Sequence, residues 1–327
     1  MRSDPPEELL GQLRQAGEAV LFCHVAPDGD TLGSARALEL LLNVLGWRTS
    51  MVVDGEVPVR LRFLPGLVLH RPEEWVMPEN AAAIAVDVSS PDRLGKAEAL
   101  YNAADRRWVI DHHGTNPHFG QINWVEGDAP ATGILVNRLY RAMNAPLTKE
   151  AAVCLYTALS TDTGNFVYDS VNGECFEMMA GLMEAGLPLA EISRVLFREK
   201  REDFVRLLAV TLPSLRVTEA GCIAGLCTSL EQFRQNGLDP AETDGVVDYA
   251  IDIQGVCMAY YLHQQGENAV KSSLRALPPY RVDQVARQFG GGGHPQAAGC
   301  TLRMPVAQAV REVEAALQQA LEEQRNS

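Results

Sequence analysis

The chain has 327 residues, of which 46% are hydrophobic and 21% charged, a composition typical of folded globular proteins and not of disordered ones. Its formal net charge of −14 at pH 7 argues against a protein that coats long nucleic acid duplexes, although a local pocket could still bind a small phosphate. No apolar stretch approaches the roughly 20 residues of a membrane span, and the 7 cysteines form no CxxC pair, so a cytoplasmic protein without membrane segments or disulfides is expected.

The first half of the chain alternates between predicted strands and helices. Four apolar runs are short enough for buried strands: 18–25, 47–54, 81–88 and 106–113. Four other segments carry apolar residues at helical spacing: 31–46, 131–143, 148–160 and 173–185. This order predicts an α/β fold with a mostly parallel sheet flanked by helices on both faces. In such a sheet, ligands collect at the carboxyl ends of the strands.

The second half of the chain begins with a charged segment. Residues 188–208 are predicted to form one long helix that links a domain at 1–187 to a domain at 209–327. Three further elements are expected: a strand at 221–228, a hairpin at 256–277 and a helix at about 305–324. The second domain is therefore predicted to be a smaller mixed α/β unit.

Four clusters of acidic residues and histidines follow predicted strands or lie on a helix: HVAPDGD at 24–30, VDVSSPDR at 86–93, DHHGTN at 111–116 and STDTGNF at 160–166. Carboxylates and imidazoles together suit Mn²⁺ or a similar ion. Converging carboxylates would shift towards protonation unless cations neutralised them. Two ions about 3.5–4 Å apart that share one aspartate would meet this need, and such a pair can generate a hydroxide and stabilise a phosphoryl transition state.

Each cluster by itself also has a structural interpretation. The sequence PDGD suits a turn followed by a helix N-cap, Asp87 suits a turn, and Asp162 suits the end of a helix. The sequence DHH could belong to a salt-bridged surface. All four clusters in this order, each after an apolar run, favour a metal site over these alternatives.

The order HxxxDxD, VD, DHH and TDTG resembles that of the DHH phosphoesterase superfamily. The sequence GGGGHPQAAGC at 290–300, together with VKSSLR at 270–275, is similar to the signature of the DHH-associated C-terminal domain. The resemblance covers nearly the whole chain, whose length and layout are most similar to the nanoRNase branch. That branch acts as an oligoribonuclease and as a 3′-phosphoadenosine 5′-phosphate phosphatase.

The resemblance implies a centre of two Mn²⁺ ions, for which Mg²⁺ or Co²⁺ could substitute. Six ligands are implied: His24, Asp28 and Asp87 for one ion, and Asp30, Asp87, His112 and Asp162 for the other. Two catalytic residues are implied as well. His113 would contact the substrate phosphate and its leaving oxygen, and Asp111 would orient the neighbouring histidines.

The later motif is implied to bind the substrate. Five residues are expected to contact it: Arg275, Gly291, Gly292, Gly293 and His294. The glycines would let backbone N–H groups approach an anion, the histidine would add a donor, and the arginine offers a fork matched to phosphate. A flexible loop is the alternative for the glycine run. Three histidines, His70, His118 and His263, are given no role, and His70 and His263 are expected at the surface or in loops.

The sequence therefore predicts a two-metal phosphoesterase with in-line attack by hydroxide. The expected substrates are short RNA or DNA oligonucleotides, hydrolysed to mononucleotides, and 3′-phosphoadenosine 5′-phosphate, hydrolysed to AMP. Long duplexes and membranes are not expected as partners, and a homodimer stays open. The acidic composition agrees with short substrates, because a short oligonucleotide needs one binding pocket, whereas a long strand would need a basic track.

The same residues leave several rival functions. A phosphodiesterase for linear or cyclic dinucleotides would use the same metal site. A processive exonuclease of the superfamily would need further nucleic-acid-binding domains, and its inorganic pyrophosphatases have a different C-terminal domain. A non-catalytic nucleotide sensor would need neither two metals nor His113.

Overall fold

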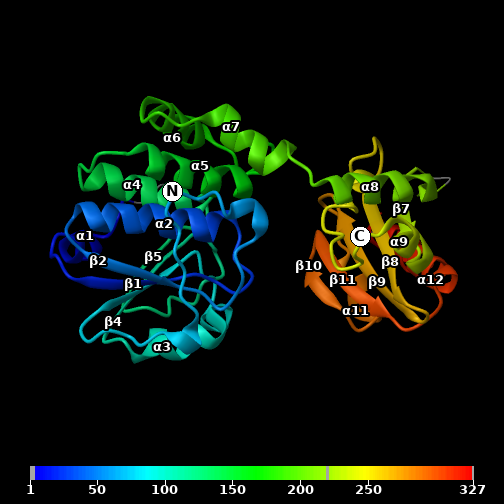
Figure 1. Ribbon diagram of the computed structural model, residues 1–327, viewed down its shortest axis with the longest axis horizontal. Helices are drawn as coiled ribbons and strands as arrows, with labels where there is room; N and C mark the ends of the chain where they lie inside the picture. Colours follow the sequence, from blue (N-terminus) through cyan, green and yellow to red (C-terminus); the bar gives the residue numbers. More distant parts are fainter. Residues whose placement is uncertain (1–3, 219–220, 326–327) are drawn as a thin grey trace. The chain divides into compact units, whose positions relative to one another are not determined.

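The computed structural model describes residues 4–218 and 221–325 (Figure 1). The chain folds into two compact units and passes from one to the other between Glu199 and Lys200. Each unit has its own sheet and its own apolar core. No helix among the described residues combines the length and the apolar character that crossing a bilayer requires.

The first unit is built on a sheet in which every neighbouring pair of strands runs parallel, in the order β2-β1-β3-β4-β5. The strands are β1 Glu18–Phe22, β2 Arg48–Val52, β3 Ala82–Val86, β4 Arg106–Asp111 and β5 Ile122–Val125. Strands β1 to β4 were predicted, and each ends two or three residues before its expected boundary. Strand β5 was not predicted, since it has only 4 residues and lies at the edge.

Helices cover both faces of this sheet, as predicted. The helices are α1 Glu7–Leu13, α2 Gly29–Val44, α3 Glu98–Ala103, α4 Thr132–Ala142, α5 Lys149–Asp162, α6 Gly173–Glu184 and α7 Leu189–Ser193. Three short 3₁₀ segments lie at Val59–Leu61, Pro72–Glu74 and Pro91–Ala97. Figure 1 shows α2, α4 and α5 on one side of the strands and α3 on the other. The two faces accordingly have separate apolar clusters.

The single long helix predicted over 188–208 is wrong. Helix α7 continues into a π-helical turn, Arg194–Arg198, after which the backbone becomes extended, and α8 begins anew at Glu202. The apolar faces of the two helices belong to different cores. Ile192 packs in the first unit, whereas Leu207 packs in the second. One continuous helix could not pack its apolar face in both cores. The helical spacing of apolar residues in the sequence therefore continues across a point where the helix is interrupted.

The second unit contains a mixed sheet of strand order β10-β11-β9-β8-β7-β6. Its strands are β6 Arg216–Val217, β7 Ile223–Thr228, β8 Met258–Gly266, β9 Ala269–Ala276, β10 Gly292–His294 and β11 Ala297–Leu302. Only β7 and β8 pair in parallel among these strands of the described residues. The predicted hairpin is confirmed as β8 and β9, and the predicted strand at 221–228 as β7.

Helices pack on both faces of the second sheet. They are α8 Glu202–Thr211, α9 Leu230–Asn236, α10 Asp248–Ile251, α11 Asp283–Gln288 and α12 Val306–Arg325, with a 3₁₀ turn at Leu212–Ser214. The apolar residues of α11 and α12 share one cluster with β8 and β9, and those of α8, α9 and α10 share another with β7 and β8. The predicted terminal helix is confirmed as α12.

Candidate metal centre

The carboxyl ends of three adjacent parallel strands bring the predicted ligands of the first unit together. His24 follows β1, Asp87 follows β3, and Asp111 is the last residue of β4, with two histidines directly behind it. Because β1, β3 and β4 are neighbours, these positions share one edge of the sheet. The N-terminus of α2 and the C-terminus of α5 add the remaining aspartates.

A first group consists of His24, Asp28 and Asp87, whose ligand atoms lie within 4.8 Å of one another. The Nε2 atom of His24 is 3.6 Å from Asp28 Oδ2 and 3.7 Å from Asp87 Oδ2. The other ring nitrogen of His24 lies 2.8 Å from the carbonyl oxygen of Val25. With a proton on Nδ1 for that bond, Nε2 keeps a lone pair for a cation.

Asp28 also fulfils the structural interpretation of the sequence PDGD. Its Oδ1 atom accepts the backbone N–H groups of Asp30 and Thr31, at 3.0 and 3.1 Å, and so caps α2. Its Oδ2 atom faces His24. The cap and the candidate ligand are therefore two oxygens of one carboxylate, and the two interpretations do not exclude each other.

A second group consists of Asp30, His112 and Asp162, again with ligand atoms within 4.8 Å of one another. His112 Nε2 lies 3.2 Å from Asp162 Oδ2 and 3.7 Å from Asp30 Oδ2. The Nδ1 atom of His112 is 3.0 Å from the carbonyl oxygen of Ala129. This backbone contact holds the ring with Nε2 towards the carboxylates, as Val25 does for the first group.

Asp87 stands between the two groups. One oxygen, Oδ2, faces His24 at 3.7 Å, and the other, Oδ1, faces His112 Nε2 at 3.6 Å. The hydroxyl of Thr132 donates to Oδ1 at 2.9 Å. Asp87 has a φ of 60°, in the left-handed region that non-glycine residues rarely adopt. This conformation turns its carboxylate towards both histidines.

Asp30 is fully buried, and its carboxylate accepts three hydrogen bonds. Ser34 Oγ donates at 2.7 Å, and the backbone N–H groups of Thr132 and Gly133 donate at 2.6 and 3.0 Å. The last two groups are the first residues of α4, whose N-terminus carries a partial positive charge. These contacts fix the position of Asp30 without adding a full charge to offset its own.

The charges of the two groups are not balanced. Burial, followed by the carboxylate of Asp162, raises the pKa of Asp30 to about 7. Burial, followed by Asp30, also holds the pKa of Asp87 well above its usual range. Burial alone would lower the pKa of His112, but the carboxylates around it, Asp162 foremost, raise it to about 10. The negative charge of the cluster thus favours the binding of protons. A divalent cation would neutralise the same charge, and carboxylates and imidazoles are ligands that suit such a cation.

The side chains of Asp111 and His113 form a pair beside these groups. Asp111 is fully buried and accepts from His113 Nδ1 at 2.8 Å and from Asn116 Nδ2 at 2.7 Å. Burial would raise the pKa of Asp111, but these contacts outweigh it and lower the pKa. Asp111 therefore orients His113 alone. The expectation that it orients both histidines is corrected, because His112 is held by the Ala129 carbonyl instead.

Both units of the chain resemble domains of known proteins. The N-terminal domain model of the DHH family matches residues 18–159, and the DHHA1 domain model matches residues 222–323. A Thermus thermophilus protein named bifunctional oligoribonuclease and PAP phosphatase NrnA is 31% identical over 300 residues, which cover 90% of this chain and 88% of that protein. This chain belongs to the DHH family.

Other relatives agree with this membership. A Bacillus subtilis protein that carries the same NrnA name is 23% identical over 298 residues. The match covers 90% of this chain and 92% of that protein. The solved structure of an exopolyphosphatase-related protein from Bacteroides fragilis has a TM-score of 0.87 at 26% identity, and the match covers 96% of this chain and 95% of that one. The resemblance stated from the motifs is confirmed, and so is the fold class.

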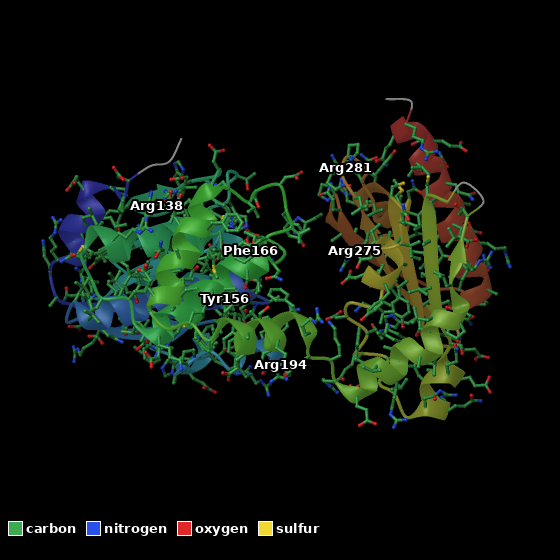
Figure 2. The ribbon with its side chains drawn as sticks, turned by 90° about the horizontal axis from the view of Figure 1, so that it is seen from above. Arg138, Tyr156, Phe166, Arg194, Arg275 and Arg281 are labelled. Carbon is green, nitrogen blue, oxygen red and sulfur yellow. The ribbon has the colours of Figure 1, made fainter. Side chains whose placement is uncertain are left out.

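The DHHA1 region places two of the predicted substrate-binding residues in one row of the sheet. His294 on β10 is paired with Ala297 on β11, which in turn is paired with Arg275 on β9. Directly paired residues point to the same face of a sheet, so the histidine and the arginine flank a small alanine. The guanidinium of Arg275, labelled in Figure 2, lies with Nε 3.3 Å from Asp248 Oδ1.

The glycine run of this DHH protein is not a plain flexible loop, since Gly292 and Gly293 belong to β10. A Cβ atom at Gly291 would lie 2.1 Å from the carbonyl oxygen of Gly299, and one at Gly293 would lie 2.5 Å from that of Ala297. These two glycines are thus required where the backbone passes close to β11. Gly292 has open space around it.

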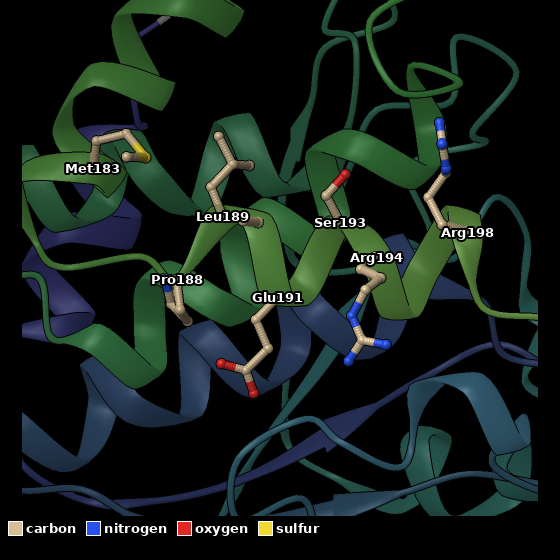
Figure 3. A pocket seen from close by; sticks show the side chains of 8 residues that line it. Met183, Pro188, Leu189, Glu191, Ser193, Arg194 and Arg198 are labelled. Carbon is tan, nitrogen blue, oxygen red and sulfur yellow. The ribbon is translucent and has the colours of Figure 1, made fainter.

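Surface depressions occur in both units of the described chain. One, of about 820 Å³, contains the glycine run and two cationic side chains; its lining is Lys271, Ser272, Phe289, Gly290, Gly291, Gly292, Gly299, Cys300, Thr301 and Arg303. Another, of about 670 Å³, lies along α7 and is mostly apolar (Figure 3). Neither is lined by residues of the two metal groups.

Sequence reasoning missed several residues around the centre. The DHHGTN cluster contains Asn116, whose side chain holds Asp111, but the sequence pattern does not indicate this role. Thr132 and Ala129 were missed because one acts through a hydroxyl and the other through a backbone carbonyl, which leave no mark in a single sequence. The surface placement expected for His263 is wrong: it is 1% exposed, in β8.

Proposed function

We propose that this DHH-family protein is a two-metal phosphoesterase that hydrolyses short oligonucleotides to mononucleotides and 3′-phosphoadenosine 5′-phosphate to AMP. The observation that carries the proposal is the position of Asp87, which faces His24 with one oxygen and His112 with the other. A shared carboxylate between two imidazole-containing groups is the arrangement that a pair of divalent ions needs.

The substrate class rests on the relatives. The names of the Thermus thermophilus and Bacillus subtilis proteins state an oligoribonuclease and a PAP phosphatase, and both matches extend over nine tenths of this chain. The net charge of −14 supports a short substrate, because a long strand would require a basic track. The free cysteines of the described chain support a reducing compartment, and we place the protein in the cytoplasm.

The first and second groups would hold the two cations, with Asp87 between them. Mn²⁺ is proposed because mixed carboxylate and imidazole ligands suit it, and Mg²⁺ or Co²⁺ would substitute. Bound cations would supply a nucleophile at neutral pH and neutralise charge on the phosphoryl oxygens. His113 donates from Nδ1 to Asp111, which leaves Nε2 for the phosphate or the leaving oxygen. The His113 side chain is 41% exposed and can reach a substrate.

In the second unit, Arg275, the glycine run and His294 are proposed to bind a substrate phosphate. Arg275 offers N–H groups in a fork, and its contact with Asp248 is 3.3 Å long at a site where both side chains are partly exposed. A phosphate dianion can displace such a carboxylate. A Cβ atom at Gly292 would meet nothing within 4 Å, so an anion can approach the backbone closely at this position.

A substrate panel tests the function directly. Purified protein is incubated with di- to pentanucleotides of RNA and DNA, 3′-phosphoadenosine 5′-phosphate, pyrophosphate and cyclic dinucleotides, each with Mn²⁺ and after chelation. We expect metal-dependent release of mononucleotides from the short oligonucleotides and of AMP from 3′-phosphoadenosine 5′-phosphate. Turnover of cyclic dinucleotides or pyrophosphate alone would contradict the proposal.

A further inference from the structure

Arg138, labelled in Figure 2, lies within α4. Two carboxylates enclose its guanidinium. Nη1 and Nη2 donate to the two oxygens of Glu126 at 2.7 and 2.9 Å, while Nε and Nη2 donate to the two oxygens of Glu174 at 2.8 and 2.7 Å. The three side chains are between 6% and 9% exposed. Buried ion pairs are costly to desolvate and often add little stability, so this one calls for another reason.

The contact with Glu126 reaches the second metal group through the backbone. Glu126 directly follows β5, and its N–H donates to the carbonyl of Asp111 at 3.1 Å. The N–H of Ala129 donates to the carbonyl of Glu126 at 3.0 Å. The carbonyl of Ala129 in turn lies 3.0 Å from His112 Nδ1. The position of Glu126 therefore sets the position of the acceptor that orients His112.

The same guanidinium fixes the other end of this segment. Arg138 belongs to α4, whose first residues donate to Asp30 from the N–H groups of Thr132 and Gly133. Thr132 also donates its hydroxyl to Asp87. By holding Glu126, Arg138 closes the segment 126–133 between β5 and α4 into a loop of fixed shape.

The contact with Glu174 connects Arg138 with the segment that follows Asp162, the remaining member of the second group. Glu174 lies in the first turn of α6, and α6 follows the segment that begins after Asp162 at the end of α5. Arg138 thus connects the loop that orients His112 and Asp30 with the helix beyond Asp162. The first group is tied to this segment only through its shared member, because among the described residues Thr132 donates to Asp87. Its other two members are held elsewhere, His24 by Val25 and Asp28 by the N-terminus of α2.

We propose that Arg138 is a positioning residue that sets the affinity of the second group, Asp30, His112 and Asp162, for its cation. The inference rests on the proposed metal centre and adds to it an asymmetry, because His24 and Asp28 of the first group are held by contacts that do not involve Arg138. Changes to residues that orient metal ligands typically cost about 10- to 100-fold in metal affinity. A role in stability alone would affect neither group selectively.

The test measures Mn²⁺ binding by calorimetry and by electron paramagnetic resonance, without any substrate. Arg138→Lys keeps the charge but loses the fork that holds two carboxylates. In this variant we expect the second group to bind its Mn²⁺ about 10- to 100-fold more weakly than in the wild type. The affinity of the first group for Mn²⁺ should stay within about twofold of the wild-type value. Glu174→Gln, of equal size, should also weaken Mn²⁺ binding by the second group, but by a smaller factor. This variant provides the test if Arg138→Lys does not fold.

Two backgrounds separate the groups. Asp28→Asn keeps the helix cap and weakens the first group, whereas Asp162→Asn weakens the second. Adding Arg138→Lys should lower the remaining affinity in the Asp28→Asn protein and leave it unchanged in the Asp162→Asn protein. Arg36→Lys is the matched control, because Arg36 is 14% exposed, pairs with Glu39, and contacts no residue of either group in the described chain. It should leave both affinities unchanged.

The outcomes are distinct. Equal weakening of both ions, or unchanged affinities with a lower melting temperature, would show that Arg138 serves stability alone. A wild-type protein that binds fewer than two ions would overturn the metal centre itself, and the role of Arg138 with it. Two ions bound by the wild type, with no turnover of any oligonucleotide, would refute the proposed function and leave the role of Arg138 intact.

Discussion

His113 donates from Nδ1 to the buried Oδ1 of Asp111 at 2.8 Å, so the histidine that follows His112 in the DHH motif is oriented by a carboxylate and not by the backbone. Because Asp111 keeps a lowered pKa, the pair holds a proton on Nδ1 and leaves Nε2 for the substrate. This arrangement is suited to proton transfer and not to the binding of a cation alone.

His113→Ala is therefore expected to lower kcat by about 10²- to 10⁴-fold, the usual contribution of a positioned acid or base, while two Mn²⁺ ions still bind. Steady-state kinetics and elemental analysis of the same preparation measure both effects. His118→Asn is the matched control, because His118 is exposed, lies in the same loop and has a φ of 57° that asparagine tolerates. Wild-type turnover by the alanine variant would remove His113 from the mechanism.

Asp87→Asn should abolish turnover and reduce the affinity for both cations by more than about 100-fold, because both groups lose a ligand. Asparagine suits the φ of 60° at this position, so the variant should stay folded. Its apo form should be at least as stable as the wild type, since the pKa of Asp87 is held well above its usual range by burial. Calorimetric titration with Mn²⁺ and thermal unfolding provide the two measurements.

Asp92→Asn serves as the control for this variant, because Asp92 is an exposed aspartate of the same sequence cluster. It should change neither metal affinity nor turnover. Retention of one tightly bound ion by Asp87→Asn would contradict a shared carboxylate and favour two independent sites.

The metal groups were predictable because parallel strands end at one edge, and the sequence shows which polar residues follow each strand. His24, Asp87 and Asp111 needed only that rule. What the sequence could not show are contacts between distant segments: the carbonyl of Ala129 against His112, or the guanidinium of Arg138 between Glu126 and Glu174. Helical periodicity is likewise local, so it did not reveal that residues 188–208 serve two cores.

Arg275→Ala should raise the KM for short oligonucleotides by about ten- to hundredfold, the value of a charge-assisted hydrogen bond. It should leave kcat on a small phosphate ester within about twofold. Asp248→Asn frees the same guanidinium from its partner at 3.3 Å and should lower the KM by a few fold. Kinetics with both substrates test the two variants. Equal losses on both substrates would show that Arg275 serves folding and does not bind the oligonucleotide.

His263 predicts a pH dependence of stability in the second unit. Burial, followed by the nearby charge of Lys271, lowers the pKa of His263 to about 4, against 6.5 for the free side chain, and only Asp244 acts in the opposite direction. Between these two pH values the unfolded chain binds more protons than the folded one. The free energy of unfolding must therefore fall as the pH is lowered from about 6.5 to 4, by up to about 3 kcal/mol.

His263→Gln removes the titrating group and should flatten this dependence. Urea unfolding at pH 7 and at pH 4.5, followed for both proteins, gives the two slopes. The glutamine variant pays a fixed cost at both pH values, because a buried ring that stacks on Tyr261 is lost. The wild type alone should lose additional stability at the lower pH. Equal losses on acidification in both proteins would assign the dependence to other groups, since the imidazole would then not be taking up the proton.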